Sequence, residues 1–225
     1  MEQILTQIVV PVNQEIYLKD PLSSDLGKRI IQEGTELIET LGMEGFNFKK
    51  LSEKVGSTEA AIYRYFENKH KLLLYLTNWY WGWLEHNLVF VTANLLDPKD
   101  KMRVAIQLLV EGPVYKQNIY IDIQKLRVLV TEESYKAFLT KEIDAENSNG
   151  LFTQFYRLTD RIAQIIKEIN PTYSYPKTLV TTLVESTLLH AFFLRHMPKM
   201  TESGLKADQK LGFYFDLVFK TLKDE

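Results

Sequence analysis

The sequence predicts an all-α protein in which a three-helix head is joined by one long helix to a helical-bundle body. From residue 26 to the C-terminus, apolar side chains recur every three or four positions, which is the spacing of one helix face. No stretch of useful length alternates apolar and polar residues as a strand does. The periodic segments are interrupted at Gly112-Pro113, Ser148-Asn149-Gly150, Asn170-Pro171 and Met197-Pro198. We expect an extension at 1–25, the head at 26–75 and the body at 76–225.

Composition excludes several classes of protein. A chain of 225 residues is long enough for one large domain or two small ones. Its 45% hydrophobic and 25% charged residues are typical of a soluble globular protein, and the absence of cysteine excludes disulfides and thiol catalysis. No apolar run approaches the ~20 residues of a membrane helix, and the N-terminus lacks the features of a secretory signal. We therefore expect a cytoplasmic protein without a membrane partner.

Residues 1–25 precede the first helix of the head. Apolar residues around Pro11 predict two short extended segments joined by a turn. An isolated hairpin is marginally stable in water, so this extension is expected to cover other parts of the protein. An arm that enters a DNA groove is the weaker interpretation, because Lys19 alone is basic before Asp20.

The head begins with a helix over 26–41 that ends at Gly42. Its apolar stripe consists of Ile30, Gly34, Leu37 and Leu41, with Ile31 and Ile38. Two short helices follow. Asn47 is the N-cap of the first, which buries Phe48, Leu51 and Val55.

Gly56 can adopt the left-handed conformation that ends this helix. Thr58 caps the second short helix, which turns Ala61, Ile62 and Tyr65 or Phe66 inward. Asn68 caps a long helix that runs to about Leu95, before Asp97-Pro98. Two short helices around a glycine turn are what a DNA-reading helix-turn-helix requires.

The charges of this stretch agree with that interpretation. Although the net charge of the chain is -2, basic residues exceed acidic ones between residues 47 and 71. The basic residues are Lys49, Lys50, Lys54, Arg64, Lys69 and Lys71, and the acidic ones are Glu53, Glu59 and Glu67. A charged run of this kind is by itself more often a solvated face, but here it coincides with the predicted helix-turn-helix.

The head resembles the DNA-binding domain of the TetR family of transcriptional regulators. The residues that carry the resemblance are Lys28-Arg29-Ile30-Ile31, Gly42-Met43-Glu44-Gly45-Phe46, Leu51-Ser52, Val55-Gly56, Ile62-Tyr63-Arg64-Tyr65-Phe66, Asn68-Lys69 and Leu72. Ser52 and Ser57 depart from the family pattern. The resemblance implies a helix-turn-helix head joined to a ligand-binding and dimerisation body, and a repressor that a small hydrophobic ligand releases from operator DNA.

The second short helix is the expected recognition helix. Its outward residues are Glu59, Ala60, Tyr63 and Arg64. Arg64 can bind a guanine edge or a phosphate, Glu59 can accept a hydrogen bond from cytosine, and Ala60 can touch a thymine methyl group.

Five more residues complete the predicted DNA-binding set. The resemblance assigns phosphate contacts to Tyr63, Tyr65 and Lys69, and Lys49 is placed to reach a base or a phosphate. The two caps Asn47 and Thr58 are included as well. For Tyr65 we keep the alternative of a half-buried packing residue.

The body is predicted to be a bundle with helices near 99–111, 117–130, 132–142, 150–169, 177–197 and 206–222. The last two helices are apolar around most of their circumference, so each must bury two faces. One face belongs to the core of the subunit. The other predicts a homodimer built from 177–197 and 206–222, and the alternative is a larger monomer core.

The body is rich in aromatic residues, and the resemblance implies that a small effector binds there. An aromatic stripe is equally typical of a core, so no pocket residue is assigned. The four histidines lack metal-binding spacing, and we expect no catalytic residue, metal or cofactor. An alternative function keeps the same helical dimer but acts through ligand or protein binding without specific DNA recognition.

Overall fold

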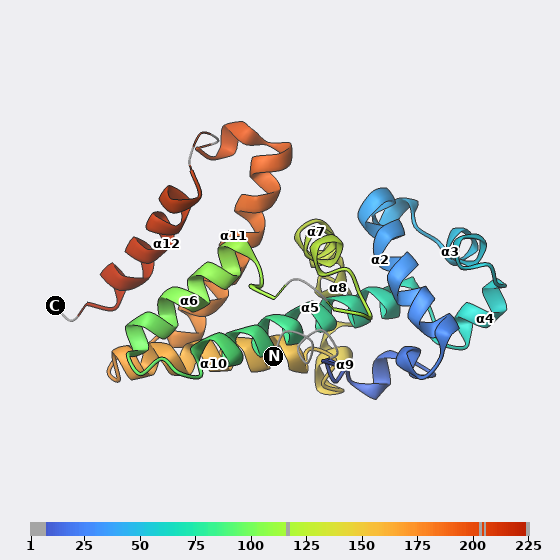
Figure 1. Cartoon of the computed structure of the whole chain (residues 1–225), viewed down its shortest axis with the longest axis horizontal. Coiled ribbons are helices and arrows are strands. Elements are labelled where there is room, and N and C mark those ends of the chain that lie inside the picture. Colours follow the sequence, from blue (N-terminus) through green and yellow to red (C-terminus); the bar gives the residue numbers. More distant parts are fainter. Residues whose placement is uncertain (1–7, 116–117, 203, 205, 224–225) are drawn as a thin grey trace. The chain divides into compact units, whose positions relative to one another are not determined.

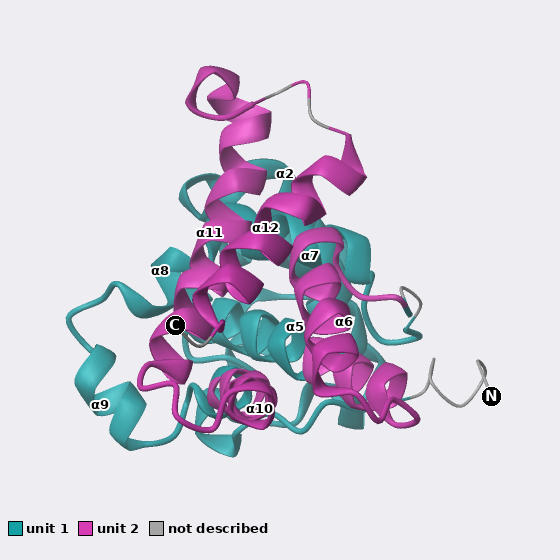
Figure 2. Cartoon of the chain, turned by 90° about the vertical axis from the view of Figure 1, so that its left-hand side faces the viewer, with its two compact units in different colours: residues 1–82, 115–155 teal, residues 83–114, 156–225 magenta. Residues whose placement is uncertain are grey.

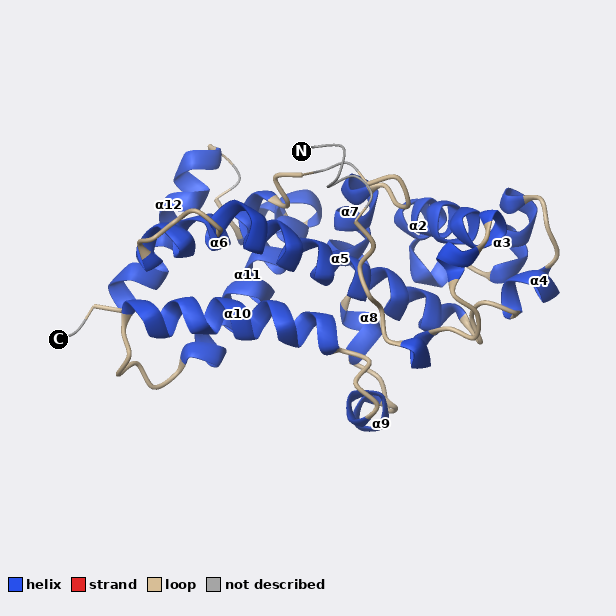
Figure 3. Ribbon diagram, turned by 60° about the horizontal axis from the view of Figure 1, so that its bottom comes forward, coloured by secondary structure: helices blue, strands red, loops and turns tan. Residues whose placement is uncertain are grey.

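The computed structural model describes residues 8–115, 118–202, 204 and 206–223. Throughout these residues the regular elements are helices, which confirms the all-α prediction (Figures 1 and 3). The α-helices are α2 (Asp25–Gly45), α3 (Phe48–Val55), α4 (Glu59–Tyr63), α5 (Lys69–Thr92), α6 (Pro98–Glu111), α7 (Ile123–Glu133), α8 (Tyr135–Phe138), α9 (Ile143–Ser148), α10 (Thr153–Ile169), α11 (Pro176–His196) and α12 (Ala207–Thr221). Short 3-10 helices are η1 (Gln14–Ile16), η2 (Pro21–Ser23) and η3 (Pro198–Met200). None of the described helices is both long and apolar enough to cross a membrane.

The chain forms two compact units (Figure 2). The first contains residues 1–82 and 115–155, and the second contains residues 83–114 and 156–225. Helices α5 and α10 each contribute residues to both units. The predicted boundaries after residues 25 and 75 stay a prediction.

The N-terminal segment of the first unit contains 3-10 turns where extended segments were predicted, so the hairpin prediction is wrong for residues 8–25. The reason is local capping: Asn13 accepts a hydrogen bond from the Glu15 amide, and Asp20 accepts one from the Leu22 amide. The part of this prediction that concerns residues 1–7 lies outside the described residues. Val10 and Ile16 are buried, so the segment covers helices of its own unit.

Gly82 shows how closely this segment approaches α5. A Cβ atom at Gly82 would overlap Cγ1 of Val10, and the side chain of Gln154 donates a hydrogen bond to the carbonyl of Pro11. The segment therefore packs against the middle of α5 and is hydrogen-bonded to the first turn of α10.

Helix α2 continues one turn beyond its predicted end. Gly42 has φ 66° and ψ 167°, which interrupts the helix, and the chain resumes helical geometry up to Gly45. Leu41, predicted as part of the buried stripe, is 40% exposed. Three other residues of the predicted stripe, Ile30, Ile31 and Ile38, are buried as expected, and the helix packs against α3 and α7.

The middle of the chain departs most from prediction. The helix expected at 117–130 begins only at Ile123, because the Asp122 carboxylate caps the amides of Gln124 and Lys125. The helix expected at 132–142 is reduced to the four residues of α8. Helix α9 was not predicted, while the predicted break at Gly150, with φ 73°, is present.

The second unit is built on α6, which packs against both α11 and α12 (Figure 2). Its apolar core includes Ile106, Leu183, Val184 and Val218. Arg103 adds a cation–π contact with Phe219, at 5.1 Å from the ring centroid. The predicted helices at 99–111, 177–197 and 206–222 correspond to α6, α11 and α12.

Candidate nucleic-acid interface and effector groove

Helices α3 and α4 form a helix-turn-helix with the predicted caps (Figure 3). The Asn47 side chain accepts from the Lys50 amide at 2.9 Å, and the Thr58 hydroxyl accepts from the Ala61 amide at 3.2 Å. Gly56 between them has φ 64° and ψ 46°, the left-handed conformation that glycine adopts without steric cost. Asn47 and Thr58 are both exposed, and their contact with DNA stays a prediction.

Packing inside the head fixes which edge of α4 faces solvent. Ile62 and Phe66 are fully buried, and the ring of Tyr63 contacts that of Phe48 edge-on, with centroids 5.0 Å apart. The outward residues are Glu59, Ala60, Tyr63 and Arg64, and all four are exposed. The predicted orientation of α4 is therefore present, while the DNA contacts of these residues stay predictions.

The basic residues of the head fall into two groups. Lys49 and Arg64 are exposed, and neither forms an ion pair with any described residue. Lys50 and Lys54 are engaged within the protein: Lys50 donates to the carbonyl of Gly45, and Lys54 lies 3.7 Å from a carboxylate oxygen of Glu33. Lys49 and Arg64 thus present uncompensated positive charge beside α3 and α4.

Lys69 has a structural role that sequence reasoning did not anticipate. Its ammonium group donates to the carbonyls of Met43 at 2.6 Å and Phe46 at 3.3 Å, which ties the start of α5 to the end of α2. An ammonium group has three donor hydrogens, so one is left for another acceptor. If Lys69 binds a phosphate as predicted, its ammonium group does so while it also donates to the carbonyls of Met43 and Phe46.

Tyr65 is 4% exposed, which favours the packing alternative. Its hydroxyl shares a hydrogen bond of 2.7 Å with the Ser24 hydroxyl, and its carbonyl accepts from the Leu18 amide at 2.8 Å. The ammonium group of Lys19 lies over its ring, 5.1 Å from the centroid. No local pattern in the sequence indicated that residues 18–24 would meet the end of the helix-turn-helix.

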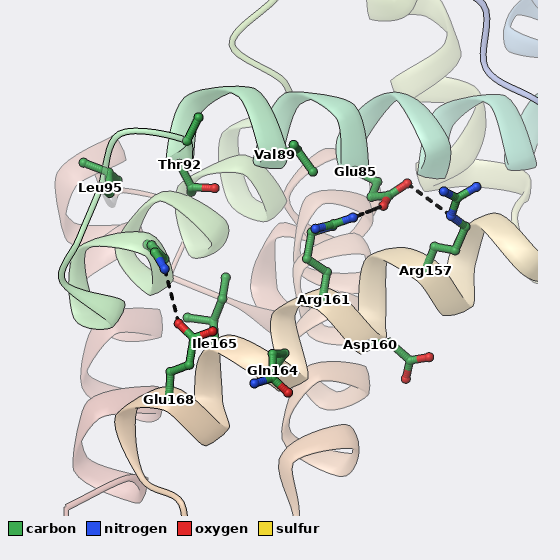
Figure 4. Close-up of a pocket in the computed structure, with 12 residues that line it drawn as sticks. Glu85, Val89, Thr92, Leu95, Arg157, Asp160, Arg161, Gln164, Ile165 and Glu168 are labelled. Carbon is green, nitrogen blue, oxygen red and sulfur yellow. Dashed lines mark hydrogen bonds and ion pairs between the residues drawn. The ribbon is translucent and has the colours of Figure 1, made fainter.

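A surface groove of about 570 Å³ lies in the second unit, between α5 and α10 (Figure 4). At one end the Glu85 carboxylate is buried and faces two arginines. Arg161 donates to Glu85 Oε1 from Nε at 3.1 Å and from Nη2 at 2.7 Å, while Nε of Arg157 lies 3.7 Å from Oε2. Two guanidinium groups thus face the Glu85 carboxylate, and Asp160 of the same helix as the arginines also lines the groove.

The rest of the groove is partly apolar. Val89, Ala93, Leu95 and Ile165 contribute apolar surface, and Lys101 pairs with Glu168 at 3.3 Å at the far end. The lining contains no aromatic residue. Trp79 and Trp83 of α5 are instead 0% and 1% exposed, so the core alternative holds for these two aromatics.

His86 follows Glu85 on α5. Burial lowers the pKa of His86, and the nearby Glu85 carboxylate opposes that shift while Arg157 and Arg161 add to it. The groove therefore has a histidine beside it that prefers the neutral form.

These features define a class of protein: an all-helical chain whose head contains a helix-turn-helix. Residues 30–76 match the sequence model of the family described as bacterial regulatory proteins, tetR family. Residues 30–76 are thus a TetR-family DNA-binding domain, and the chain has the fold of the TetR-family transcriptional regulators.

Three solved structures illustrate the likeness. A putative transcriptional regulator from Saccharomonospora viridis in complex with choline has a TM-score of 0.62 at 14% identity, covering 85% of this chain and 94% of that one. AibR in complex with isovaleryl coenzyme A and operator DNA has a TM-score of 0.56 at 16% identity, covering 85% and 98%. PfmR, a TetR-family regulator from Thermus thermophilus, has a TM-score of 0.53 at 17% identity, covering 88% and 97%. No curated protein matches this chain in a sequence comparison.

Proposed function

We propose that this chain is a DNA-binding transcriptional repressor whose affinity for operator DNA is lowered by a small ligand. The observation that carries the proposal is the outward edge of α4, where Glu59, Ala60, Tyr63 and Arg64 are exposed beside a packed core. A recognition helix with its N-terminal residues free can enter the major groove, while the preceding helix rests on the backbone. The match of residues 30–76 to a family of bacterial regulatory proteins supports this function over the alternative, a helical dimer that acts without specific DNA recognition.

Sequence reading is assigned to α4, and phosphate binding to residues around it. Arg64 is proposed to bind a guanine edge or a phosphate, and Glu59 to accept from cytosine. Tyr63 and Lys49 are proposed to bind DNA phosphates. Lys69 is proposed to bind another phosphate through the third N–H of its ammonium group, which donates to no backbone carbonyl.

A homodimer is proposed to supply two DNA-binding heads, one from each subunit. The C-terminal half of α11, η3 and α12 expose apolar side chains in the second unit: Leu189 at 36%, Met197 at 47%, Met200 at 61% and Phe213 at 52%. Exposed apolar residues that recur along neighbouring elements are typical of a protein interface. Across a two-fold axis, such an interface places two recognition helices in successive major grooves about 34–36 Å apart.

The effector is proposed to bind in the groove between α5 and α10. Its apolar wall suits a small hydrophobic molecule, and its two guanidinium groups suit an acidic group on that molecule. The ligand must bind better to a dimer whose heads no longer match successive grooves, because a ligand without such a preference shifts no equilibrium.

The test is a gel-shift assay with duplex DNA from the promoter beside the gene that encodes this chain, against a scrambled duplex of equal length. We expect retention of the promoter duplex at salt concentrations that release the scrambled one. Equal release of both duplexes would contradict specific recognition. Arg64→Ala serves as the matched variant, because it alters the outward edge without touching the core.

A further inference from the structure

We propose that Lys19, which lies before the head and outside residues 30–76, binds a DNA phosphate beside the recognition helix. The inference rests on the proposed function, and it adds a contact from a segment to which neither the motif nor the family model assigns one. Lys19 would also take the place of Tyr65, which was predicted to bind phosphate. The hydroxyl of Tyr65 is instead hydrogen-bonded to the hydroxyl of Ser24.

The backbone on both sides of Lys19 is held in place. On one side Ile16 is 1% exposed, and the ring of Tyr17 packs edge-on against Tyr75 with centroids 6.0 Å apart. On both sides the chain is bonded to Tyr65, through the Leu18 amide and the Ser24 hydroxyl. The backbone around Lys19 is thus fixed against Tyr65, the residue next to Arg64. Lys19 therefore lies beside the end of the recognition helix.

The side chain of Lys19 is exposed, and its charge is uncompensated. It forms no ion pair with any described residue. The carboxylate of its neighbour Asp20 caps η2 by accepting from the Leu22 amide at 2.8 Å. The ring of Tyr65, 5.1 Å from the ammonium group, attracts the cation without neutralising it. The ammonium group of Lys19 is therefore not committed to an ion pair and can bind an anion.

The position of the Lys19 ammonium group, next to the end of the recognition helix, indicates which anion it binds. Arg64 and the outward edge of α4 are proposed to enter the major groove, and phosphates line both sides of that groove. Among the lysines of the head, Lys50 and Lys69 already donate to backbone carbonyls and Lys54 pairs with Glu33, whereas Lys49 is exposed like Lys19. Lys19 takes up the role of a phosphate contact that positions the recognition helix without reading the sequence.

The experiment compares Lys19→Gln with the full-length parent protein, by fluorescence anisotropy of labelled promoter and scrambled duplexes from about 50 to 200 mM KCl. We expect the slope of log K against log salt to flatten by about 0.9 for each bound subunit, and affinity at 0.1 M salt to fall about eightfold per subunit. The loss is expected to be the same for both duplexes. Lys19→Arg keeps the charge and is expected to retain the parent slope.

Lys99→Gln is the matched control, because Lys99 is an exposed lysine of α6 in the second unit, outside the proposed dimer interface, that forms no ion pair with a described residue. A merely structural Lys19 would alter thermal stability and leave the salt slope unchanged, so an unchanged slope with Lys19→Gln overturns the inference. If the parent protein binds neither duplex at any salt concentration, the proposed function itself fails. Binding by the parent with a flattened slope only in Lys19→Gln supports both.

Discussion

The substitution Glu85→Gln tests how much the buried carboxylate of the groove contributes to folding. Glu85 is 5% exposed and accepts two hydrogen bonds from Arg161, with Arg157 close by. Glutamine has nearly the same shape, so the change removes the negative charge and leaves the packing intact. What remains is an amide oxygen facing two guanidinium groups.

The size of the effect follows from the exposure of the partners. Hydrogen bonds to charged groups contribute about 1.5–3 kcal/mol, and breaking a fully buried pair costs about 3–5 kcal/mol. The side chains of Arg157 and Arg161 are 53% and 45% exposed, so water can solvate both once the charge is gone. The amide oxygen also keeps one acceptor for Arg161. We therefore expect the free energy of unfolding to fall by about 1–2 kcal/mol.

The assay is urea unfolding followed by circular dichroism, at one fixed protein concentration because the stability of a dimer depends on concentration. Asp160→Asn is the matched control. Asp160 lies on the same helix as the arginines and pairs with Lys177 at 2.7 Å, but the two side chains are 56% and 76% exposed. An exposed pair of this kind contributes about 0–1 kcal/mol. Equal losses for Glu85→Gln and Asp160→Asn would refute the reasoning from burial.

Four further outcomes are expected. Lys69→Ala should weaken DNA binding almost equally for all sequences and flatten the salt slope by about one unit per contact, measured by anisotropy; an unchanged slope would leave Lys69 with its structural tie alone. Arg64→Ala should change sequence preference, with a loss of ~1–3 kcal/mol in a competition assay if its contact is bidentate to a base. Because burial lowers the pKa of His86, the folded protein binds fewer protons than the unfolded chain as the pH falls below about 6.5. Stability should fall in that range, and His86→Gln should reduce the fall when urea unfolding is compared at neutral and acidic pH. Gly56→Ala should lower the free energy of unfolding by about 1–2 kcal/mol, because a Cβ there meets nothing within 4 Å and only its left-handed backbone resists the change.

The parts of the head that depend on neighbouring residues were predictable. The caps at Asn47 and Thr58 and the left-handed turn at Gly56 each follow from residue types within four positions of one another. The outward edge of α4 follows from helical spacing, because Ile62 and Phe66 define the inner face.

Features that join distant parts of the chain were not predictable. The burial of Tyr65 depends on Leu18 and Ser24, and the hydrogen bond to Ser24 joins residues 41 positions apart. The groove exists because Glu85 meets Arg161 across 76 positions. The start of α7 was misplaced because apolar periodicity continued through the residues before Asp122, and the cap decided the boundary.

The packing of the N-terminal segment has a practical consequence for anyone who wishes to isolate the head. The sequence match begins at residue 30, yet Tyr17 packs against Tyr75, and Ser24 shares a hydrogen bond with the Tyr65 hydroxyl. A fragment that begins at residue 30 would expose Tyr65 and Tyr75 to water, and it would lose the hydrogen bond between Ser24 and Tyr65. Such a fragment is expected to aggregate, whereas a fragment that begins before Val10 retains the segment that covers these side chains.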